Sequence, residues 1–288
     1  MRILVTGAAG FAGKYIIRYL LNKGHVVTGL YRNNMPTDVS GCRLFQQDIS
    51  KKIELSDQFD AIIHTACAHP NKENTFHIFK RDNIDSMEQL INFAHKNHIH
   101  IIVNLSTKNV YGKTLENDIK EESDIANQDL YGLSKYAAEC LLREADDIQG
   151  LSLRLPGLVG QEAHDIWLVK MVEKIKCGEN VVVSDIVTRN FVWVEDLAVF
   201  VEKVIVDAVH QKNFLYNTVN LACLSGSSNV EIVETIKRRI GSSSRIIVQF
   251  PRFGAGNLDA SKAFEMGYCS PTPLQIVNQY LTCLGFPE

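Results

Sequence analysis

The chain has 288 residues, 45% of them hydrophobic, and its 30 basic and 33 acidic side chains give a formal net charge of -3. A chain of this size can bury a large core without disulfides or metals, and its balanced charge argues against a nucleic-acid partner and a polybasic membrane patch. The sequence has no apolar run near the roughly 18 residues that span a bilayer, and no signal-peptide layout. Its seven cysteines include no C-x-x-C pair, which favours free thiols in a reducing compartment. We therefore expect a cytoplasmic protein that binds neither membranes nor nucleic acids.

Short β-branched runs alternate with longer helical patterns through the first half of the sequence. The predicted elements are strands at 3–6, 26–31, 44–45, 61–63 and 99–105 and helices at 11–22 and 75–96. Because these strands are apolar rather than alternating, they predict a parallel sheet that helices cover on both faces. The expected fold class is α/β, with a doubly wound parallel sheet.

The pattern loosens after Leu155. Helices are predicted at 166–176 and 229–240, and glycine and proline punctuate the last third of the chain. The segment from Phe191 to Val209 predicts an apolar strand and a helix that return to the main sheet. The expected division is a main domain of residues 1–155 together with 187–210, and a smaller, discontinuous lobe of residues 156–186 and 211–288.

A glycine-rich loop follows the first predicted strand and opens the first predicted helix. Gly7, Gly10 and Gly13 are spaced G-x-x-G-x-x-G, and Phe11 and Ala12 stand between the last two glycines. Glycines at these positions let the backbone approach a pyrophosphate, whose charge meets the helix N-terminus. A purely structural turn is the alternative, but the strand–loop–helix context predicts a dinucleotide site.

The second predicted strand ends at Arg32 without the acid that usually selects NAD. Arg32 instead predicts NADP, by pairing with its 2′-phosphate, with NAD as the alternative cofactor and a solvated surface arginine as the structural alternative. Asp48, followed by Ile49, comes after the strand at Leu44 and Phe45. It is either a contact to the adenine amino group or an ordinary helix N-cap.

Tyr131 and Lys135 form a Y-x-x-x-K pair on a predicted helix that runs to about Glu144. This spacing puts both side chains on one helix face, where the lysine ammonium can stabilise a tyrosinate for proton exchange near neutral pH. The strand upstream ends with Ser106 and Thr107, and either hydroxyl there could hydrogen-bond a substrate oxygen. A surface pair on the helix and capping of the following turn are the structural alternatives.

Together these motifs resemble the extended short-chain dehydrogenases, the NAD-dependent epimerase/dehydratase family of nucleotide-sugar enzymes, over nearly the whole chain. Further matching segments are His64–Cys67 (H-x-A-A), Asn83, Ser106–Gly112, Arg189–Ala198 (R-D-F-I-H-V-x-D-L-A) and Leu258–Ala263 (D-x-S-K-A). The resemblance implies a Rossmann-type fold with a smaller C-terminal substrate lobe, a nicotinamide cofactor, a nucleotide-sugar substrate, and a homodimer formed through a two-helix face.

The resemblance also implies a set of site residues. It assigns catalysis to Thr107, Tyr131 and Lys135. Cofactor contacts are expected from Gly7, Gly10, Phe11, Ala12, Gly13, Arg32, Asp48, Ile49, Thr65, Ala66, Cys67, Asn83, Tyr131, Lys135 and Pro156. Substrate contacts are expected from Lys108, Asn109, Arg189 and Arg252, of which the two arginines suit a diphosphate. Surface solvation is the alternative for each arginine, and packing as a small apolar residue is the alternative for Cys67.

Departures from the family pattern narrow the expected reaction. Lys108 and Asn109 stand where dehydratases carry an Asp-Glu pair, which argues against elimination of water. The asparagine with which the family contacts the sugar nucleotide would fall near Gly157, so that contact is missing. Asn190 and Trp193 replace the Asp and His of the R-D-F-I-H-V segment. The prediction is reduction of a nucleotide-bound 4-keto-sugar, with Tyr131 as proton donor. The alternatives are a 4-epimerase with tightly bound NAD and a non-catalytic dinucleotide-binding regulator.

Three histidines invite a metal site. His98 and His100 flank Ile99 at the start of a predicted strand, and His95 precedes them. No suitably spaced carboxylate or cysteine accompanies them, so no metal is expected.

Overall fold

The structure is a computed structural model that describes every residue except 72, 74, 115, 117, 127, 185–186, 211–215, 250–255 and 288. It divides into two compact units. The first unit consists of Met1–Gly112, Ile125–Arg154 and Leu197–Val219, and the second of Lys113–Asp124, Leu155–Asp196 and Asn220–Glu288. The predicted division differs over 113–124, 155 and 187–196, which belong to the second unit, and over 216–219, which belong to the first.

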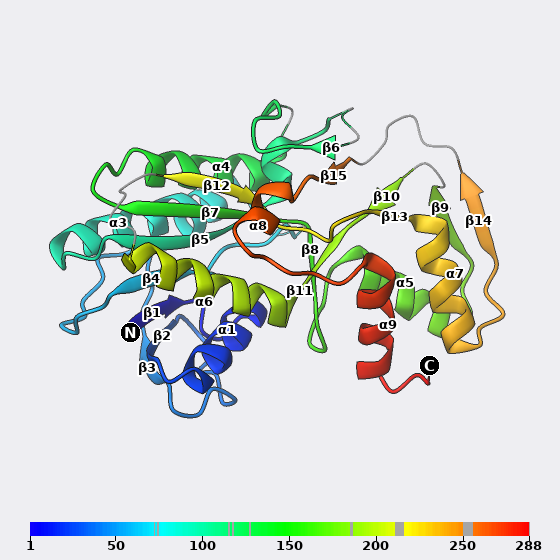
Figure 1. Ribbon diagram of the computed structural model, residues 1–288, viewed down its shortest axis with the longest axis horizontal. Helices are drawn as coiled ribbons and strands as arrows, with labels where there is room; N and C mark the ends of the chain where they lie inside the picture. The colour runs from blue at the N-terminus through cyan, green and yellow to red at the C-terminus, as the bar shows by residue number, and fades with distance from the viewer. Residues whose placement is uncertain are drawn as a thin grey trace. The chain divides into compact units, whose positions relative to one another are not determined.

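A seven-stranded sheet forms the centre of the first unit (Figure 1). Its strands in spatial order are β12 (Asn217–Asn220), β7 (Gln149–Leu155), β5 (Ile101–Thr107), β4 (Ala61–His64), β1 (Arg2–Thr6), β2 (Val26–Tyr31) and β3 (Arg43–Gln46). The five strands from β5 to β3 pair in parallel. Every residue of β5 and β4 is buried, as their uninterrupted apolar runs predict.

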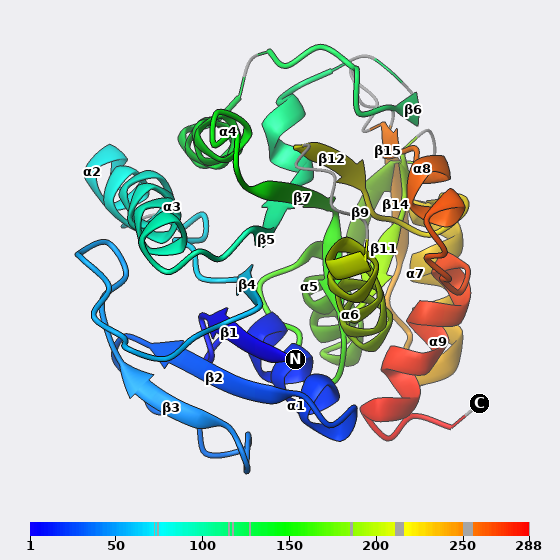
Figure 2. The same ribbon diagram turned by 60° about the vertical axis from the view of Figure 1, so that its left-hand side comes forward.

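Helices cover both faces of this sheet. They are α1 (Phe11–Asn22), α2 (Phe76–Phe79), the π-helical turn η1 (Lys80–Asp85), α3 (Ser86–Lys96), the 3₁₀ turn η2 (Lys108–Tyr111), α4 (Leu130–Arg143) and α6 (Val194–His210). Figure 2 shows α3 and α4 on one face and α1 and α6 on the other. The predicted fold class, a Rossmann-type α/β fold, is confirmed.

The strand order determines where a ligand can bind. β1 lies between β4 and β2, and the chain adds β2 and β3 on one side of it before it returns to add β4 and β5 on the other. The loops that follow β1 and β4 therefore leave the sheet in opposite directions. In open α/β sheets, the crevice at such a reversal receives the ligand.

The strand predicted from Phe191 onward does not join the main sheet. β7 ends at Leu155, where Pro156 follows without an N–H group to extend the pairing. The next strand, β8, pairs in parallel with β11, which begins at Phe191, and the later strand β12 takes the place at the edge of the main sheet. The helix that follows β11 belongs to the first unit from Leu197 onward.

The second unit contains short strand pairs and four helices among its described residues. Its strands are β6 (Asp118–Ile119), β8 (Gly157–Val159), β9 (Val181–Ser184), β10 (Thr188–Arg189), β11 (Phe191–Trp193), β13 (Ser227–Ser228), β14 (Ile246–Gln249) and β15 (Asn257–Leu258). Its helices are α5 (Trp167–Lys176), α7 (Asn229–Ile240), α8 (Ser261–Glu265) and α9 (Pro273–Cys283). Across the described part of both units, none of the helices has the length and apolar character that a membrane crossing needs.

A buried ion pair joins the elements that surround the end of β5. Glu139 on α4 and Arg154 on β7 are 1% and 3% exposed, with Arg154 Nη2 2.7 Å from Glu139 Oε2. The Ser106 hydroxyl on β5 donates to Glu139 Oε1, and the Arg154 guanidinium lies 4.7 Å from the centroid of the Tyr111 ring in η2. Burial lowers the pKa of Arg154, but the hydrogen bonds and charge of Glu139 more than reverse this effect.

Replacing Glu139 by Ala should lower the free energy of unfolding by about 3–5 kcal/mol, because Arg154 would keep a buried charge without a partner. Urea denaturation at neutral pH measures the change. The matched control is Glu144→Ala at the exposed end of α4, which should leave the free energy of unfolding nearly unchanged. Equal stability losses in the two variants would contradict this role for the ion pair.

Candidate active site

The loop between β1 and α1 has a backbone geometry that suits a bound phosphate group. Gly7 has a φ of +72°, and a Cβ atom there would lie 2.8 Å from the backbone nitrogen of Ala66. A Cβ on Gly13 would lie 2.2 Å from the carbonyl oxygen of Gly7, so α1 starts directly against the loop. Gly10 is the N-cap, and the first turn of α1, which the structure describes in full, carries no acidic residue. The N–H groups at this helix end can therefore receive a pyrophosphate.

A pocket open to solvent lies at the carboxyl ends of β1 to β4 in the first unit. The predicted cofactor residues that line it are Gly7, Gly10, Arg32, Asp48, Ile49, Thr65, Ala66 and Cys67. Phe11, Ala12 and Gly13 form the first turn of α1. The other lining residues match no motif of the sequence and are Leu30, Tyr31, Gln47, Ser50, His69, Asp82 and Ser86. Position just after a predicted strand is the signal that several of them share.

The arginine predicted to bind a 2′-phosphate is already paired. Arg32 Nη1 lies 2.7 Å from Asp82 Oδ1, and the Arg32 carbonyl accepts a hydrogen bond from Gln46 Nε2 at 3.0 Å. Asp48 accepts hydrogen bonds from the backbone N–H and the hydroxyl of Ser50, at 3.1 and 2.8 Å. Its carboxylate therefore caps its own turn while it also lines the pocket.

The three residues predicted to carry the chemistry meet where α4 packs against the end of β5. Thr107 ends β5, its hydroxyl accepts a hydrogen bond from the Asn109 N–H at 3.2 Å, and its side chain lowers the pKa of the Tyr131 phenol. Tyr131 and Lys135 lie one turn apart on α4 and are 8% and 2% exposed. A Cβ on Gly132 would lie 2.2 Å from the Asn109 carbonyl oxygen, so a glycine is needed for α4 to approach this closely. Thr107 thus both caps the turn and acts on the phenol.

The surroundings of Tyr131 favour its protonated form. Burial raises the pKa of Tyr131 well above its usual value, the negative charges of Cys67 and Asp129 raise it further, and the Thr107 side chain opposes them. Burial also lowers the pKa of Lys135, against the charge of Cys67. At neutral pH the phenol is therefore a proton donor with a buried amine one turn away.

Cys67 lies in a polar environment rather than among apolar side chains. Its Sγ atom is 3.5 Å from His69 Nε2, and the His69 ring packs against the Tyr131 ring at a centroid distance of 6.4 Å. Burial raises the pKa of the Cys67 thiol, but the hydrogen bond with His69 and the charges of His69 and Lys135 outweigh burial and bring the pKa to about 7. The thiol is therefore partly ionised at neutral pH.

Asn83 links three segments of the first unit. Its Oδ1 accepts a hydrogen bond from the Ala68 N–H at 2.7 Å, and its Nδ2 donates to the Ser134 hydroxyl at 2.8 Å. These bonds tie the segment after β4 to η1 and α4. The cofactor contact expected from Asn83 stays a prediction, since the pocket is lined by its neighbours Asp82 and Ser86.

Arg189, predicted to bind a substrate diphosphate, lies on β10 in the second unit. Its guanidinium is 4.3 Å from the centroid of the Trp167 ring, and its Nε donates to Asn229 Oδ1 at 2.8 Å. Burial lowers the pKa of Arg189 to about 10, and no carboxylate in the part of the chain that the structure describes offsets this effect. Arg189 is thus a largely buried cation that an anion would stabilise.

The remaining predicted substrate and cofactor residues lie in separate segments of the chain. Lys108 and Asn109 lie in η2 directly after β5, where Asn109 Nδ2 donates to Asp129 Oδ2 at 3.4 Å. Pro156 stands between β7 and β8 in the second unit. Arg252 lies outside the described residues.

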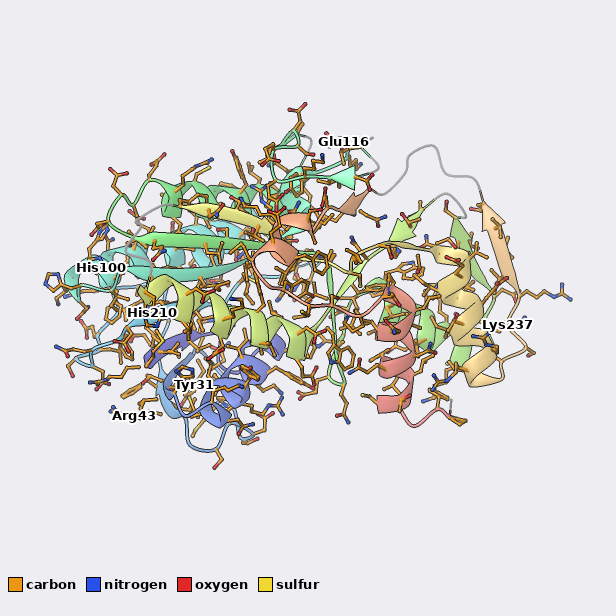
Figure 3. All side chains as sticks on the ribbon, viewed as in Figure 1. Tyr31, Arg43, His100, Glu116, His210 and Lys237 are labelled. Carbon is orange, nitrogen blue, oxygen red and sulfur yellow. The ribbon has the colours of Figure 1, made fainter. Side chains whose placement is uncertain are left out.

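The histidines near the start of β5 have other partners. His95 Nε2 is 2.7 Å from Asp147 Oδ1, and His100 Nδ1 is 3.0 Å from the carbonyl oxygen of the same aspartate. Figure 3 shows His100 at the amino end of β5, the end opposite to Thr107. Among the residues that the structure describes, no three His, Cys, Asp or Glu side chains are grouped as metal ligands.

Alkylation of Cys67 by iodoacetamide should accelerate through a midpoint near pH 7, because the thiolate is the nucleophile. Brief labelling at a series of pH values, with mass spectrometry of the Cys67 peptide, measures the midpoint. The variant His69→Ala should move it upward by removing the hydrogen bond that lowers the pKa. A midpoint near the ordinary thiol value of about 8.5 in the unaltered protein would show that His69 does not act on Cys67.

Comparison with known proteins identifies the family. The model described as "NAD dependent epimerase/dehydratase family" matches residues 3–221. The low-salt glycan biosynthesis protein Agl12 of Haloferax volcanii is 27% identical over 297 residues, covering 93% of each chain. The UDP-glucose 4-epimerase of Lactobacillus helveticus is 25% identical over 281 residues, covering 84% of this chain and 82% of the relative. A crystal structure of UDP-galactose 4-epimerase superimposes with a TM-score of 0.85 at 17% identity and covers 99% of both chains. The Bordetella bronchiseptica enzyme WbmG, in complex with NAD and UDP, gives a TM-score of 0.83 at 20% identity, with 99% of this chain and 95% of WbmG covered. The predicted family is confirmed, and the chain belongs to the NAD-dependent epimerase/dehydratase family of extended short-chain dehydrogenases.

Proposed function

We propose that the chain transfers a hydride between a nicotinamide dinucleotide and a nucleotide-activated sugar, in the direction that reduces a 4-keto group. The observation that carries this proposal is that Tyr131 and Lys135 are buried one turn apart on α4, in the same unit as the buried Thr107 at the end of β5. These groups belong to the same unit as the glycine loop and its pocket. A nucleotide-sugar substrate is supported by the names of relatives, such as UDP-glucose 4-epimerase.

The residues present fit a dinucleotide. The spaces that Cβ atoms on Gly7 and Gly13 would fill, together with the first N–H groups of α1, suit a pyrophosphate. When bound there, the dinucleotide supplies the hydride. Thr65 and Ala66, which follow β4, line the same pocket.

The protein side of the reaction is a proton transfer. Tyr131, whose raised pKa keeps it protonated at neutral pH, donates its proton to the sugar carbonyl oxygen as the carbon is reduced. Lys135 stabilises the phenolate that this transfer leaves. Thr107, whose side chain lowers the pKa of the phenol, orients the phenol hydroxyl.

Four residues are proposed to bind the substrate. Arg189, whose charge lacks a carboxylate partner among the described residues, is proposed to bind the substrate diphosphate, and Arg252 is proposed to share this role. Lys108 and Asn109 are proposed to contact the sugar, because they follow Thr107 directly. A homodimer and a cytoplasmic location complete the proposal and rest on the family resemblance and on the scattered cysteines.

A 4-epimerase is the second candidate, and one observation favours it. An epimerase must hold its reduced cofactor while the keto intermediate turns over, which suits tightly bound NAD rather than NADP drawn from a pool. The sequence predicts NADP from a free Arg32, whereas the structure pairs Arg32 with Asp82.

The two candidates predict different results when the protein is supplied with nicotinamide cofactors and nucleotide sugars. For a reductase, NADH or NADPH should be consumed stoichiometrically with a 4-keto-6-deoxy nucleotide sugar, as followed by absorbance of the reduced cofactor. Interconversion of two sugar epimers without added cofactor, by protein purified with NAD already bound, would establish the epimerase instead.

Tyr131→Phe should lower turnover on the order of a hundredfold or more, because it removes the proton donor, and should leave dinucleotide affinity unchanged. Tyr136→Phe, on the same helix, is the matched control and should keep normal turnover. Steady-state kinetics and cofactor titration measure the two effects. Near-normal turnover of Tyr131→Phe would remove Tyr131 from the proposed mechanism.

A further inference from the structure

Asp82 places a carboxylate in the dinucleotide pocket from an unexpected element. The end of β2 lacks the acid that usually selects NAD, and Arg32 stands there instead. Asp82 comes from η1, on the segment between β4 and β5, and both Arg32 and Asp82 line the pocket. Their side chains meet at 2.7 Å, with Asp82 8% exposed and Arg32 44% exposed.

A second arginine, Arg81, also pairs with the Asp82 carboxylate. Arg81 Nε lies 2.6 Å from Asp82 Oδ1, and its Nη2 lies 3.1 Å from Oδ2. Burial raises the pKa of Asp82, but the hydrogen bonds and charges of Arg81 and Arg32 outweigh burial and lower it. Asp82 is therefore ionised at neutral pH. With Asp48, whose charge also acts on Arg81, the four side chains carry two positive and two negative charges.

The backbone around Asp82 is fixed from several sides. The Ser86 hydroxyl donates to the Asp82 carbonyl at 2.7 Å. The next residue, Asn83, is bonded to Ala68 and Ser134 and is 1% exposed. Asp82 therefore cannot leave Arg32 by a shift of η1 without breaking buried hydrogen bonds.

We propose that Asp82 determines cofactor selectivity, by holding Arg32 away from a 2′-phosphate and so favouring NAD(H) over NADP(H). The inference rests on the proposed function for the presence of a dinucleotide in this pocket. A 2′-phosphate would have to displace the carboxylate from Arg32 and would then face an ionised, largely buried acid. A ribose 2′-hydroxyl brings no charge and can donate a hydrogen bond to a carboxylate. The preference expected from Arg32 alone is thereby reversed.

The test is a fluorescence titration of the intact protein with NADH and with NADPH, for the unaltered chain and for Asp82→Asn. The unaltered chain should bind NADH more tightly than NADPH. In Asp82→Asn the ratio of the two affinities should shift toward NADPH by about tenfold or more, because Arg32 would then be released to pair with the 2′-phosphate. Adding Arg32→Ala to Asp82→Asn should abolish the shift.

The matched control is Asp85→Asn, which removes the same charge from the last residue of η1. Asp85 pairs with Lys80 at 2.6 Å and is absent from the described lining of the pocket, so this variant should keep the affinity ratio of the unaltered chain. An unchanged ratio in folded Asp82→Asn, or an equal shift in Asp85→Asn, overturns the inference. So does tighter binding of NADPH by the unaltered chain, a result that needs no variant. Failure to bind either dinucleotide would instead overturn the proposed function.

Discussion

The carboxylate of Glu139 is the group on which the active-site end of the first unit depends. It is buried on α4 and receives hydrogen bonds from Arg154 on β7 and from Ser106 on β5. Each of these groups would be costly to bury alone, and together they satisfy one another. The ion pair fixes α4 against β5 and β7 at a point one turn beyond Lys135. Because α4 is held there, Tyr131 is held near the Thr107 hydroxyl at the end of β5. The arrangement of the proposed catalytic residues is thus held by an ion pair to which the proposed mechanism assigns no chemical step.

Much of the first unit could be predicted because its signals are local. The helix at 11–22 and the strand at 26–31 have the predicted bounds, since a glycine loop precedes the helix and Gly24 separates the helix from the strand. Tyr131 and Lys135 also follow from local spacing, because an α-helix places residues four apart on one face. The fold class follows from the alternation of apolar strands with helices.

The features that escaped prediction depend on contacts between residues distant in sequence. The partner of β11 is β8, because Pro156 ends β7 first, and neither propensity nor periodicity specifies that pairing. Arg32 carries the same sequence signal whether it is free or paired, and Asp82 is 50 residues further along the chain. From the sequence, Cys67 could equally be a packed small apolar residue. In the structure, His69 and Lys135 lower the pKa of its thiol. In each case the environment, rather than the residue type, decides the behaviour.

The proposed reaction must bind two anions, the dinucleotide pyrophosphate and the substrate diphosphate, and the charges at their two proposed sites differ. Several cations of the first unit are already paired with carboxylates: Arg32 and Arg81 with Asp82, and Lys14 and Arg18 with Asp38 at 3.4 and 3.7 Å. A pyrophosphate in the dinucleotide pocket would rely on backbone N–H groups and on the end of α1, whose positions the glycines fix in advance. Arg189 has no such carboxylate among the described residues, and its charge is costly until an anion arrives. A preformed pocket whose arginine is already paired suits a cofactor that binds through shape and backbone, whereas an arginine without a carboxylate partner suits a substrate whose diphosphate must be recognised and released at each turnover.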